Sequence, residues 1–234
     1  MIKLQNLLRW TLRVSVACVL IVTVTACTYA IVSGPYYSSK YSPGPQQVDP
    51  VALASLIAPE VQVEGHTCGF HSLSSVYRAY GLDPDEARLR FRLGVDRVAV
   101  PGAAGTEGTL HPDLFRVANQ DGFHIELLDP EPPLAYRAFL KHVAYNAALV
   151  LVARGEGLHW IVVDHGEHMK VRISDSLEPE PVLTDVRKLF ERPILSIVLL
   201  SPRGERDALS IPALHAAGLE EMKRVWERMD DADE

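Results

Sequence analysis

The sequence predicts an α+β fold, in which helices form the first part of one domain and a mainly antiparallel sheet follows. Between residues 67 and 120, apolar side chains recur at helical spacing, whereas from Phe123 onward they gather in short runs of strand length. A chain of 234 residues has room for one such domain and for appendages at its ends. We find no internal repeat, so a repeat architecture is excluded.

Three helices are expected before the first strand. The first covers about residues 68–80, where apolar side chains share one helical face until Gly81 ends the pattern. The second opens with Asp83-Pro84, a cap followed by a proline at the first helical position, and runs to about Leu93. The third covers roughly residues 112–120.

The strands follow from apolar runs bounded by turn residues. They are expected over residues 123–128, 147–153, 159–163, 169–174 and 194–200. Helices are expected over residues 134–146 and 185–191. The third and fourth strands should form a hairpin about the polar turn His165-Gly166-Glu167, and the last strand should close the domain.

The charge balance argues against a nucleic-acid partner. The chain has 23 Lys and Arg residues against 30 Asp and Glu residues, which gives a formal net charge of -7. Its basic residues are scattered and form no stripe that could follow a phosphate backbone. We therefore expect no binding of DNA or RNA.

Residues 1–32 are expected to anchor the chain in a membrane. Three basic residues precede an uncharged, apolar run over residues 14–32. Two interpretations stay open: Val24-Thr25-Ala26-Cys27 resembles a bacterial lipobox with Cys27 as the lipidated residue, or the run is an uncleaved transmembrane helix. Both place the following domain outward in the cell envelope, because the basic residues stay on the cytoplasmic side.

The remaining chain divides into three expected parts. Residues 33–48 are rich in Pro, Gly and Ser and should form a flexible linker. The folded domain is expected over residues 49–200. Residues 201–234 should form an acidic C-terminal tail, whose amphipathic helix at 214–229 lies on the edge of the domain.

Cys68 is the candidate nucleophile. The chain has three cysteines, and Cys18 and Cys27 lie in the N-terminal apolar run, so the domain has one thiol. A thiol in the first turn of a helix faces the positive end of the helix dipole, which favours the reactive thiolate. Gly69 should let a substrate backbone approach, and the Gln62 amide could form an oxyanion hole with the Cys68 backbone amide. The alternative is a buried structural thiol.

His159 is the candidate base, and Asp175 is its candidate partner. His159 stands at the start of one expected strand, and Asp175 follows the end of the next. Since the second strand returns antiparallel, residues 173–175 should lie opposite His159, where the Asp175 carboxylate can orient the imidazole. For His159 the alternative is a structural histidine whose ring is hydrogen-bonded to the backbone. For Asp175 the alternative is an aspartate that caps a turn.

Together these segments resemble the double-glycine leader peptidases, family 39 of the cysteine peptidases, which have a papain-like fold. The resemblance covers roughly residues 61–200 and rests on Gln62, Cys68-Gly69, the run from His159 to Val163, and Asp175. It implies the following roles: Cys68 as nucleophile, His159 as general base and acid, Asp175 as the orienting residue, and Gln62 in the oxyanion hole. Phe70-His71 follows Cys68-Gly69 where this family has proline and a small residue, so cleavage of a double-glycine leader is not implied, and a different peptide or amide substrate stays open.

We therefore expect an envelope-anchored cysteine peptidase that cleaves a peptide or amide bond through a thioester, without a metal or an organic cofactor. Two alternatives stay open. The same residues could transfer an acyl group to an amine, as papain-like transglutaminases do, or the chain could be a non-catalytic lipoprotein that binds peptides or envelope partners. His159, His165 and His168 are too irregularly spaced to predict a metal site.

Overall fold

The computed structural model describes residues 15, 18–25, 40, 42–43, 56–96, 108–131, 134–155, 157–203 and 210–232. The chain divides into two compact units, Met1–Ser42 and Pro43–Glu234. In the first unit, residues 18–25 are helical and exposed. Among the described residues, no helix is both long and apolar enough to cross a bilayer. Cys27, most of the expected linker and residues 49–55 lie outside the described residues.

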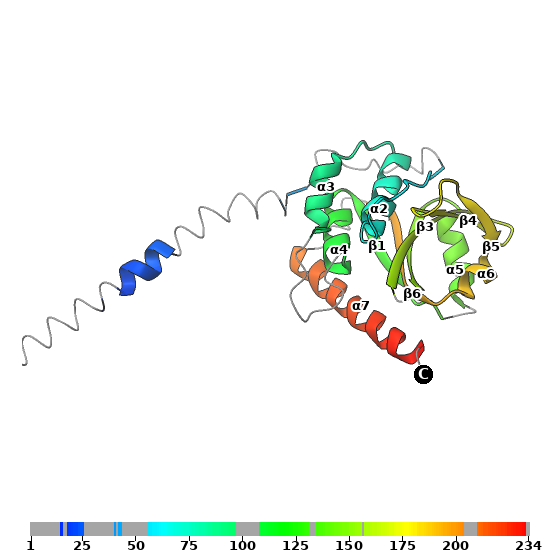
Figure 1. Cartoon of the computed structure of the whole chain (residues 1–234). Helices are drawn as coiled ribbons and strands as arrows, with labels where there is room; N and C mark the ends of the chain where they lie inside the picture. Colours follow the sequence, from blue (N-terminus) through cyan, green and yellow to red (C-terminus); the bar gives the residue numbers. More distant parts are fainter. Residues whose placement is uncertain are drawn as a thin grey trace, which may run out of the picture. The chain divides into compact units, whose positions relative to one another are not determined.

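The second unit has the predicted α+β fold (Figure 1). Its helices are α2 (Cys68–Ala79), α3 (Glu86–Leu93), α4 (His111–Gln120), α5 (Leu134–Val143), α6 (Val186–Phe190) and α7 (Ile211–Ala232). Its strands are β1 (Phe123–Leu128), β2 (Ala147–Arg154), β3 (Gly157–Glu167), β4 (Lys170–Asp175), β5 (Val182–Asp185) and β6 (Ile194–Pro202). The order of three helices before the sheet confirms the predicted fold class.

The strands form one six-stranded sheet in the order β1-β6-β2-β3-β4-β5. Every neighbouring pair in it is antiparallel. The last strand in the chain, β6, therefore lies in the interior of the sheet, between β1 and β2, and does not form an edge. Its largely apolar run suits this place, because a strand paired on both sides and covered on both faces is mostly apolar.

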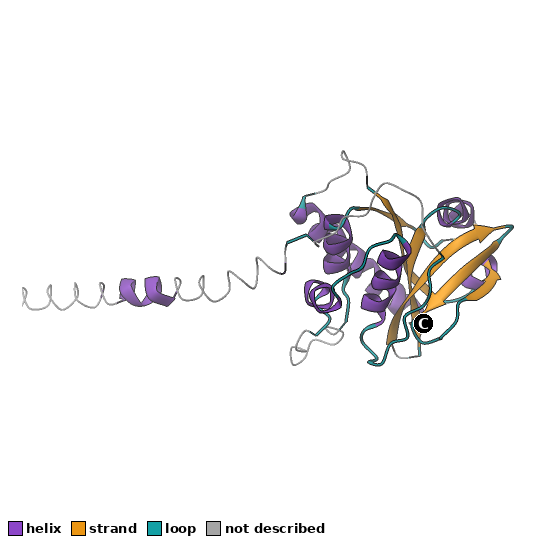
Figure 2. Cartoon of the chain, turned by 90° about the horizontal axis from the view of Figure 1, so that it is seen from above, coloured by secondary structure: helices purple, strands orange, loops and turns teal. Residues whose placement is uncertain are grey.

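Helices cover both faces of the sheet (Figure 2), and each face has its own apolar core. The core toward α2, α3, α4 and α7 includes Leu73, Leu93, Phe115, Leu149, Trp160, Val198 and Leu214. The core toward α5 and α6 includes Phe139, Val150, Ile161, Leu189 and Ile197. Alternate residues of one strand thus belong to opposite cores, which follows from the two-residue period of a β-strand.

The predicted start of α3 and the predicted end of α5 need correction. Asp85 is the N-cap of α3, and its carboxylate accepts a hydrogen bond from the Arg88 backbone at 3.0 Å. Asp83-Pro84 precedes this cap, so the proline does not occupy the first helical position. Helix α5 ends at Val143, and the backbone then turns before β2 begins.

The hairpin between β3 and β4 also differs from the prediction. Strand β3 continues through Glu167, and the turn consists of His168 and Met169, both with positive φ. This conformation at both turn residues matches the turns that fit the twist of a hairpin. Gly166 does not form the turn: a Cβ there would lie 2.7 Å from the Val143 side chain, so the glycine lets β3 pack closely on α5.

Helix α7, predicted as part of a tail, packs on α4 and β6 within the second unit (Figure 1). Leu214 and Val225 of this helix are 2% exposed and belong to the core. At Gly218 the two helices meet backbone to backbone, because an added Cβ would lie 2.5 Å from Pro112. The helix is thus an integral part of the packed unit.

A buried ion pair joins the helices on this face. Arg92 of α3 donates two hydrogen bonds to the Asp121 carboxylate after α4, at 2.7 and 2.8 Å, and both side chains are 2% exposed. The Tyr77 hydroxyl of α2 donates to the same carboxylate at 2.8 Å. Burial and the Asp121 charge raise the pKa of Tyr77 well above its ordinary value.

Asp121→Asn is expected to lower the free energy of unfolding by about 3–5 kcal/mol, because it leaves the buried Arg92 charge uncompensated. Thermal unfolding followed by circular dichroism should show a fall in Tm of roughly 10 °C. Asp129→Asn is the matched control, since Asp129 is 70% exposed and lies 4.0 Å from Arg228, and the amide oxygen of asparagine can still accept the Glu131 backbone N–H at 3.3 Å. Equal effects of the two substitutions would contradict the role given to the buried pair.

Candidate active site

Cys68 is the first residue of α2 and is 6% exposed. The turn before the helix is closed by Thr67, whose backbone N–H and hydroxyl both donate to the Glu64 carbonyl oxygen, at 3.2 and 2.8 Å. The Thr67 hydroxyl therefore makes no cap bond to the first turn of α2. The backbone amides of that turn remain as donors near the thiol.

The role of Gly69 in the structure differs from the predicted one. A Cβ at this position would lie 2.5 Å from Thr109 Cβ and 2.9 Å from Trp160 Cδ1. The glycine therefore lets the start of α2 pack against Thr109 and the β3 strand. It thereby sets how close Cys68 lies to the strand that carries His159.

His159 lies on β3 and is 5% exposed. The next residue, Trp160, faces α2, and two hydrogen bonds hold it there: its indole N–H donates to the Thr109 carbonyl at 3.3 Å, and the Ser72 hydroxyl donates to its carbonyl at 3.2 Å. Since Ser72 lies one turn beyond Cys68 on the same helix, these bonds fix the distance between the thiol-bearing helix and the histidine-bearing strand.

Asp175 ends β4 and contacts His159 directly. His159 Nε2 lies 2.6 Å from the Asp175 carboxylate, which also accepts the Leu177 backbone N–H at 2.9 Å. The predicted register is not the observed one, because Asp175 pairs with Ile161 and not with His159. His159 and Ile161 share one face of β3, so the carboxylate reaches the imidazole diagonally across the two strands.

Burial and the neighbouring groups have opposite effects on the pKa of the His159 imidazole. Burial alone would lower its pKa, but hydrogen bonds with Asp175 and Cys68, together with their charges, outweigh this effect and raise the pKa to about 9. Burial raises the pKa of Asp175, yet the hydrogen bond from His159 is the first of several contacts that hold it below its ordinary value. Because Asp175 occupies Nε2, the other ring nitrogen, Nδ1, is the one left to exchange a proton with the thiol.

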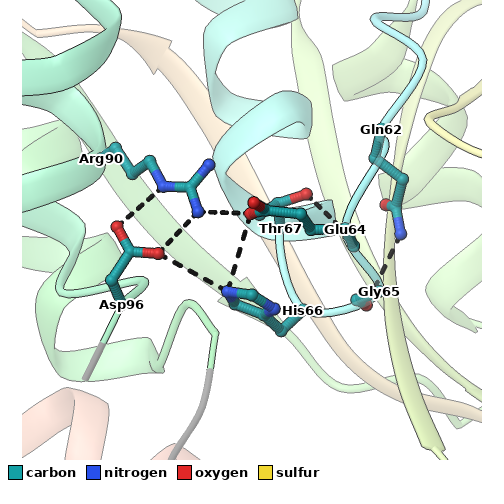
Figure 3. A network of polar contacts seen from close by, with 7 residues as sticks. All are labelled: Gln62, Glu64, Gly65, His66, Thr67, Arg90 and Asp96. Carbon is teal, nitrogen blue, oxygen red and sulfur yellow. Dashed lines mark hydrogen bonds and ion pairs between the residues drawn. The ribbon is translucent and has the colours of Figure 1, made fainter. Parts of the chain in front are cut away.

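Gln62 lies on the loop that leads into α2. Its backbone N–H donates to the Ser176 carbonyl at 2.8 Å, and its side-chain oxygen accepts the Ser176 hydroxyl at 2.6 Å. The amide nitrogen lies 3.5 Å from the Gly65 carbonyl, at the limit of a hydrogen bond (Figure 3). Among the described residues, the hydrogen-bond partners of the Gln62 side-chain amide are thus Ser176 and Gly65 and not Cys68. Its nitrogen remains weakly held and able to turn to another acceptor.

A cluster of charged residues fixes the other side of this loop (Figure 3). Arg90 of α3 donates to Asp96 at 2.8 and 2.6 Å and also to Glu64. The hydrogen bond from Arg90 is the first of the causes that lower the pKa of Asp96. His66 Nε2 lies 3.6 Å from Asp96 and 3.9 Å from Glu64. The loop before Cys68 is therefore tied to α3 on one side and to Ser176 on the other.

Glu64, His66 and Asp96 also have ligand atoms close enough together to suggest a metal site. The Arg90 guanidinium donates to both carboxylates, so a cation placed among them would meet a fixed positive charge. This donor set therefore does not fit a metal ion. We derive no step of the chemistry through one.

Two pockets adjoin the candidate residues, one at Cys68 and the other at His159 and Asp175. One, of about 370 Å³, is lined by Cys68 and by residues of the loops, β2, β3 and α7. The other, of about 360 Å³, is lined by His159 and Asp175 together with Arg154, Glu178 and Arg192. Arg154 contacts the Asp175 carboxylate at 3.3 Å. The first pocket is largely apolar, and the second carries charges of both signs.

Two contributions to this region were not predicted from the sequence. Ser176, which holds the Gln62 side chain, has only its position directly after Asp175 as a signal. The α7 residues that line the first pocket follow from a tertiary contact, and the helical periodicity of residues 214–229 could indicate a buried face but not its neighbour.

No protein-family model matches the chain, and no curated protein matches it. Several solved structures have a similar fold. The peptidase domain of Streptococcus ComA, a bi-functional ABC transporter, is 16% identical with a TM-score of 0.48, over 63% of this chain and 100% of that one. A double glycine motif protease from an AMS/PCAT transporter, solved with its leader peptide, is 18% identical with a TM-score of 0.47, over 67% of this chain and 99% of that one.

A third similar structure is the N-terminal peptidase domain of the toxin secretion ATP-binding protein from Vibrio parahaemolyticus. It is 17% identical with a TM-score of 0.38, over 58% of this chain and 98% of that one. These similarities concern the fold. Since one fold can carry many functions, they do not by themselves determine the function of this chain.

Asp175→Asn is expected to move the His159 pKa down from about 9, because the carboxylate stabilises the protonated imidazole and burial opposes it. The titration is measured from the histidine ring-proton resonances by NMR. Glu178→Gln is the matched control, since Glu178 lines the same pocket and loses the same charge. A His159 titration that stays in place in Asp175→Asn, or moves equally in both variants, would be inconsistent with this assignment.

Proposed function

We propose that this chain is a cysteine peptidase that cleaves a peptide or amide bond through a thioester on Cys68. The observation that carries the proposal is the position of His159, whose Nε2 lies 2.6 Å from Asp175 and whose pKa is raised by both Asp175 and Cys68. A nucleophile, a base and a group that orients the base are the elements of thiol-based acyl transfer.

The first half of the reaction transfers the acyl group to the thiol. His159 takes the proton of Cys68, and the sulfur attacks the carbonyl carbon of the substrate to form a C–S bond and a tetrahedral oxyanion. His159 then gives its proton to the leaving amine as the C–N bond breaks. Asp175 stabilises the imidazolium throughout, which agrees with a His159 pKa raised to about 9.

The second half returns the enzyme to its starting state. His159 takes a proton from water, whose oxygen attacks the thioester carbon, and the C–S bond breaks as the carboxylic acid leaves. Two donors are proposed for the oxyanion in both halves: the backbone N–H of Cys68 and the Gln62 amide nitrogen. Their proposed role rests on the helix N-terminus at Cys68 and on the weak 3.5 Å contact of the Gln62 nitrogen with Gly65.

We propose further that the N-terminal residues anchor the domain in the cell envelope. Their support is the basic residues followed by the apolar run over residues 14–32 and the lipobox-like Val24-Thr25-Ala26-Cys27. A peptide substrate of this enzyme would then be met outside the cytoplasm. The anchor and the peptidase activity are separate proposals, and each has its own experiment.

Cys68 is expected to react with iodoacetamide at pH 6–7 at least about tenfold faster in the unmodified chain than in His159→Ala, because the imidazole takes the thiol proton. Mass spectrometry of proteolytic peptides assigns the label to Cys68 and separates it from Cys18 and Cys27. Equal rates of Cys68 labelling in the two proteins would contradict the proposed nucleophile–base pair.

Gln62→Ala is the matched control for this experiment. It should label at Cys68 as fast as the unmodified chain, since the Gln62 amide is not part of the thiol–imidazole pair. Hydrolysis of a fluorogenic peptide found by library screening should instead fall by roughly 100-fold, the effect of losing one oxyanion donor. Product analysis with an added amine distinguishes hydrolysis from acyl transfer to that amine.

Cys27→Ser is expected to abolish incorporation of labelled palmitate into the full-length protein expressed in bacteria, because a lipobox cysteine is the site of lipidation. Cys18→Ser, in the same apolar run, should leave incorporation unchanged. A protein that carries no label before substitution, and stays in the membrane fraction with its N-terminus uncleaved, would favour the transmembrane helix and contradict the lipid anchor.

A further inference from the structure

Helix α7 forms one wall of the pocket that contains Cys68. Its contribution is a single helical stripe of four residues: Met222, Val225, Trp226 and Met229. Their spacing of three and four positions places them on one face of the helix. Trp226 is 41% exposed, although tryptophan is a large apolar residue that folding would otherwise bury. A helix that the sequence assigned to a tail thus supplies apolar surface beside the proposed nucleophile.

This wall is held by contacts that lie away from the pocket. Gly218 packs against the Pro112 backbone, where an added Cβ would lie at 2.5 Å. The buried Glu221 carboxylate accepts the Ser196 hydroxyl of β6 at 2.7 Å, and Arg228 donates to the Leu195 carbonyl. Because these contacts fix the helix to the sheet and to α4, the apolar stripe is in place before any ligand binds.

The pocket presents no fixed charge to a ligand. Its described lining residues include no Asp, Glu, Lys or Arg. His111 lies among them, and burial, followed by the charge of Arg228, lowers its pKa to about 4, so the imidazole is neutral at physiological pH. His66 at the rim faces Asp96 and Glu64. An uncharged occupant therefore suits the interior.

His111 also points to an occupant. It is 4% exposed, and its Nε2 atom is buried without a hydrogen-bond partner among the described residues. A buried polar atom is normally paired; the apolar side chain of a bound peptide cannot pair with this one, but a main-chain N–H or C=O of the same peptide can. The ring lies 5.0 Å from that of Trp160, so this polar atom sits within an otherwise aromatic and aliphatic surface.

The proposed reaction assigns the two pockets to different parts of the substrate. In the proposed reaction, His159 must reach the leaving amine to protonate it, so the amine side belongs with the pocket lined by His159 and Asp175. The acyl side remains on Cys68, which lines the α7 pocket. A side chain next to the scissile carbonyl can therefore enter the pocket between α7 and β3.

We propose that the α7 pocket is the specificity site of the enzyme and binds a large, uncharged apolar side chain on the acyl side of the scissile bond. Phenylalanine, leucine and methionine fit this description, whereas glycine would leave the pocket of about 370 Å³ empty. This inference rests on the proposed peptidase function, because it needs Cys68 as the acyl carrier. It adds the substrate class and assigns a function to α7.

The test uses peptidyl chloromethyl ketones that differ only in the side chain next to the reactive ketone: phenylalanine, leucine, glycine or glutamate. Each alkylates a thiolate by forming a C–S bond as chloride leaves, and labelling of Cys68 in the full-length chain is followed by mass spectrometry. The phenylalanine and leucine probes should label at least about tenfold faster than the glycine and glutamate probes, the size of effect an apolar pocket gives.

Trp226→Ala removes part of the wall and should reduce the advantage of the phenylalanine probe severalfold. Leu219→Ala is the matched control, since Leu219 is an exposed apolar residue of the same helix that does not line the pocket. Iodoacetamide carries no side chain and should label Cys68 equally in both variants. Equal iodoacetamide rates show that the substitutions leave the fold and the thiol intact.

The outcomes separate the two proposals. Equal rates for the four probes, or a phenylalanine advantage that survives Trp226→Ala, would overturn the α7 specificity site while iodoacetamide labelling still depends on His159. Loss of that His159 dependence would overturn the peptidase proposal itself. A preference for apolar probes that falls in Trp226→Ala and persists in Leu219→Ala supports the specificity site.

Discussion

A two-residue turn at His168 and Met169, together with a shift of register between Asp164 and Glu167, sets the pairing of β3 with β4 at the site, and the rest of the site depends on that pairing. With Ile161 opposite Asp175, the carboxylate lies on the same face as His159 and reaches its Nε2 at 2.6 Å. A slip of one residue would send Asp175 to the opposite face of the sheet. Both faces are covered by helices and both carry an apolar core, so such a slip would also expose or misplace every core residue of β4.

The second requirement is that α2 lies close to β3. Gly69 and Thr109 bring the first turn of the helix against Trp160, and the Ser72 hydroxyl fixes the same contact from the next turn. The thiol and the imidazole come from segments far apart in the sequence and meet because of this packing. The apolar surface that drives the packing belongs to the core shared by α2, α4, β2 and α7.

The burial of His159 has two opposite effects on its pKa. Removal from water disfavours the charged imidazole, yet it also strengthens the attraction of the imidazole for its partners. The pKa of His159 rises to about 9 because the partners prevail. His111, buried in the neighbouring pocket without such a partner, shows the other outcome, with a pKa lowered to about 4. Both side chains are almost fully shielded from solvent, at 4% and 5% exposure, but Asp175 and Cys68 raise the pKa of His159, whereas the Arg228 charge adds to the effect of burial on His111.

The sequence by itself determined the fold class, the boundaries of most elements, and the positions of Cys68 at a helix start and His159 on a strand. It could do so because hydrophobic period, caps and glycine stops are local properties of the chain. The sequence-based prediction placed the hairpin turn at Gly166, because glycine is typical of turns. In the structure this glycine instead allows β3 to pack closely on α5. Local pattern cannot tell these two roles apart.

Only the tertiary structure decided the place of β6 within the sheet, the diagonal contact of Asp175, the bonds of Gln62 to Ser176 and the role of α7 beside Cys68. Each of these depends on which surfaces meet after the chain has folded. An apolar helix face or strand indicates that the segment is buried. Which other segment covers it depends on shape and packing over the whole unit.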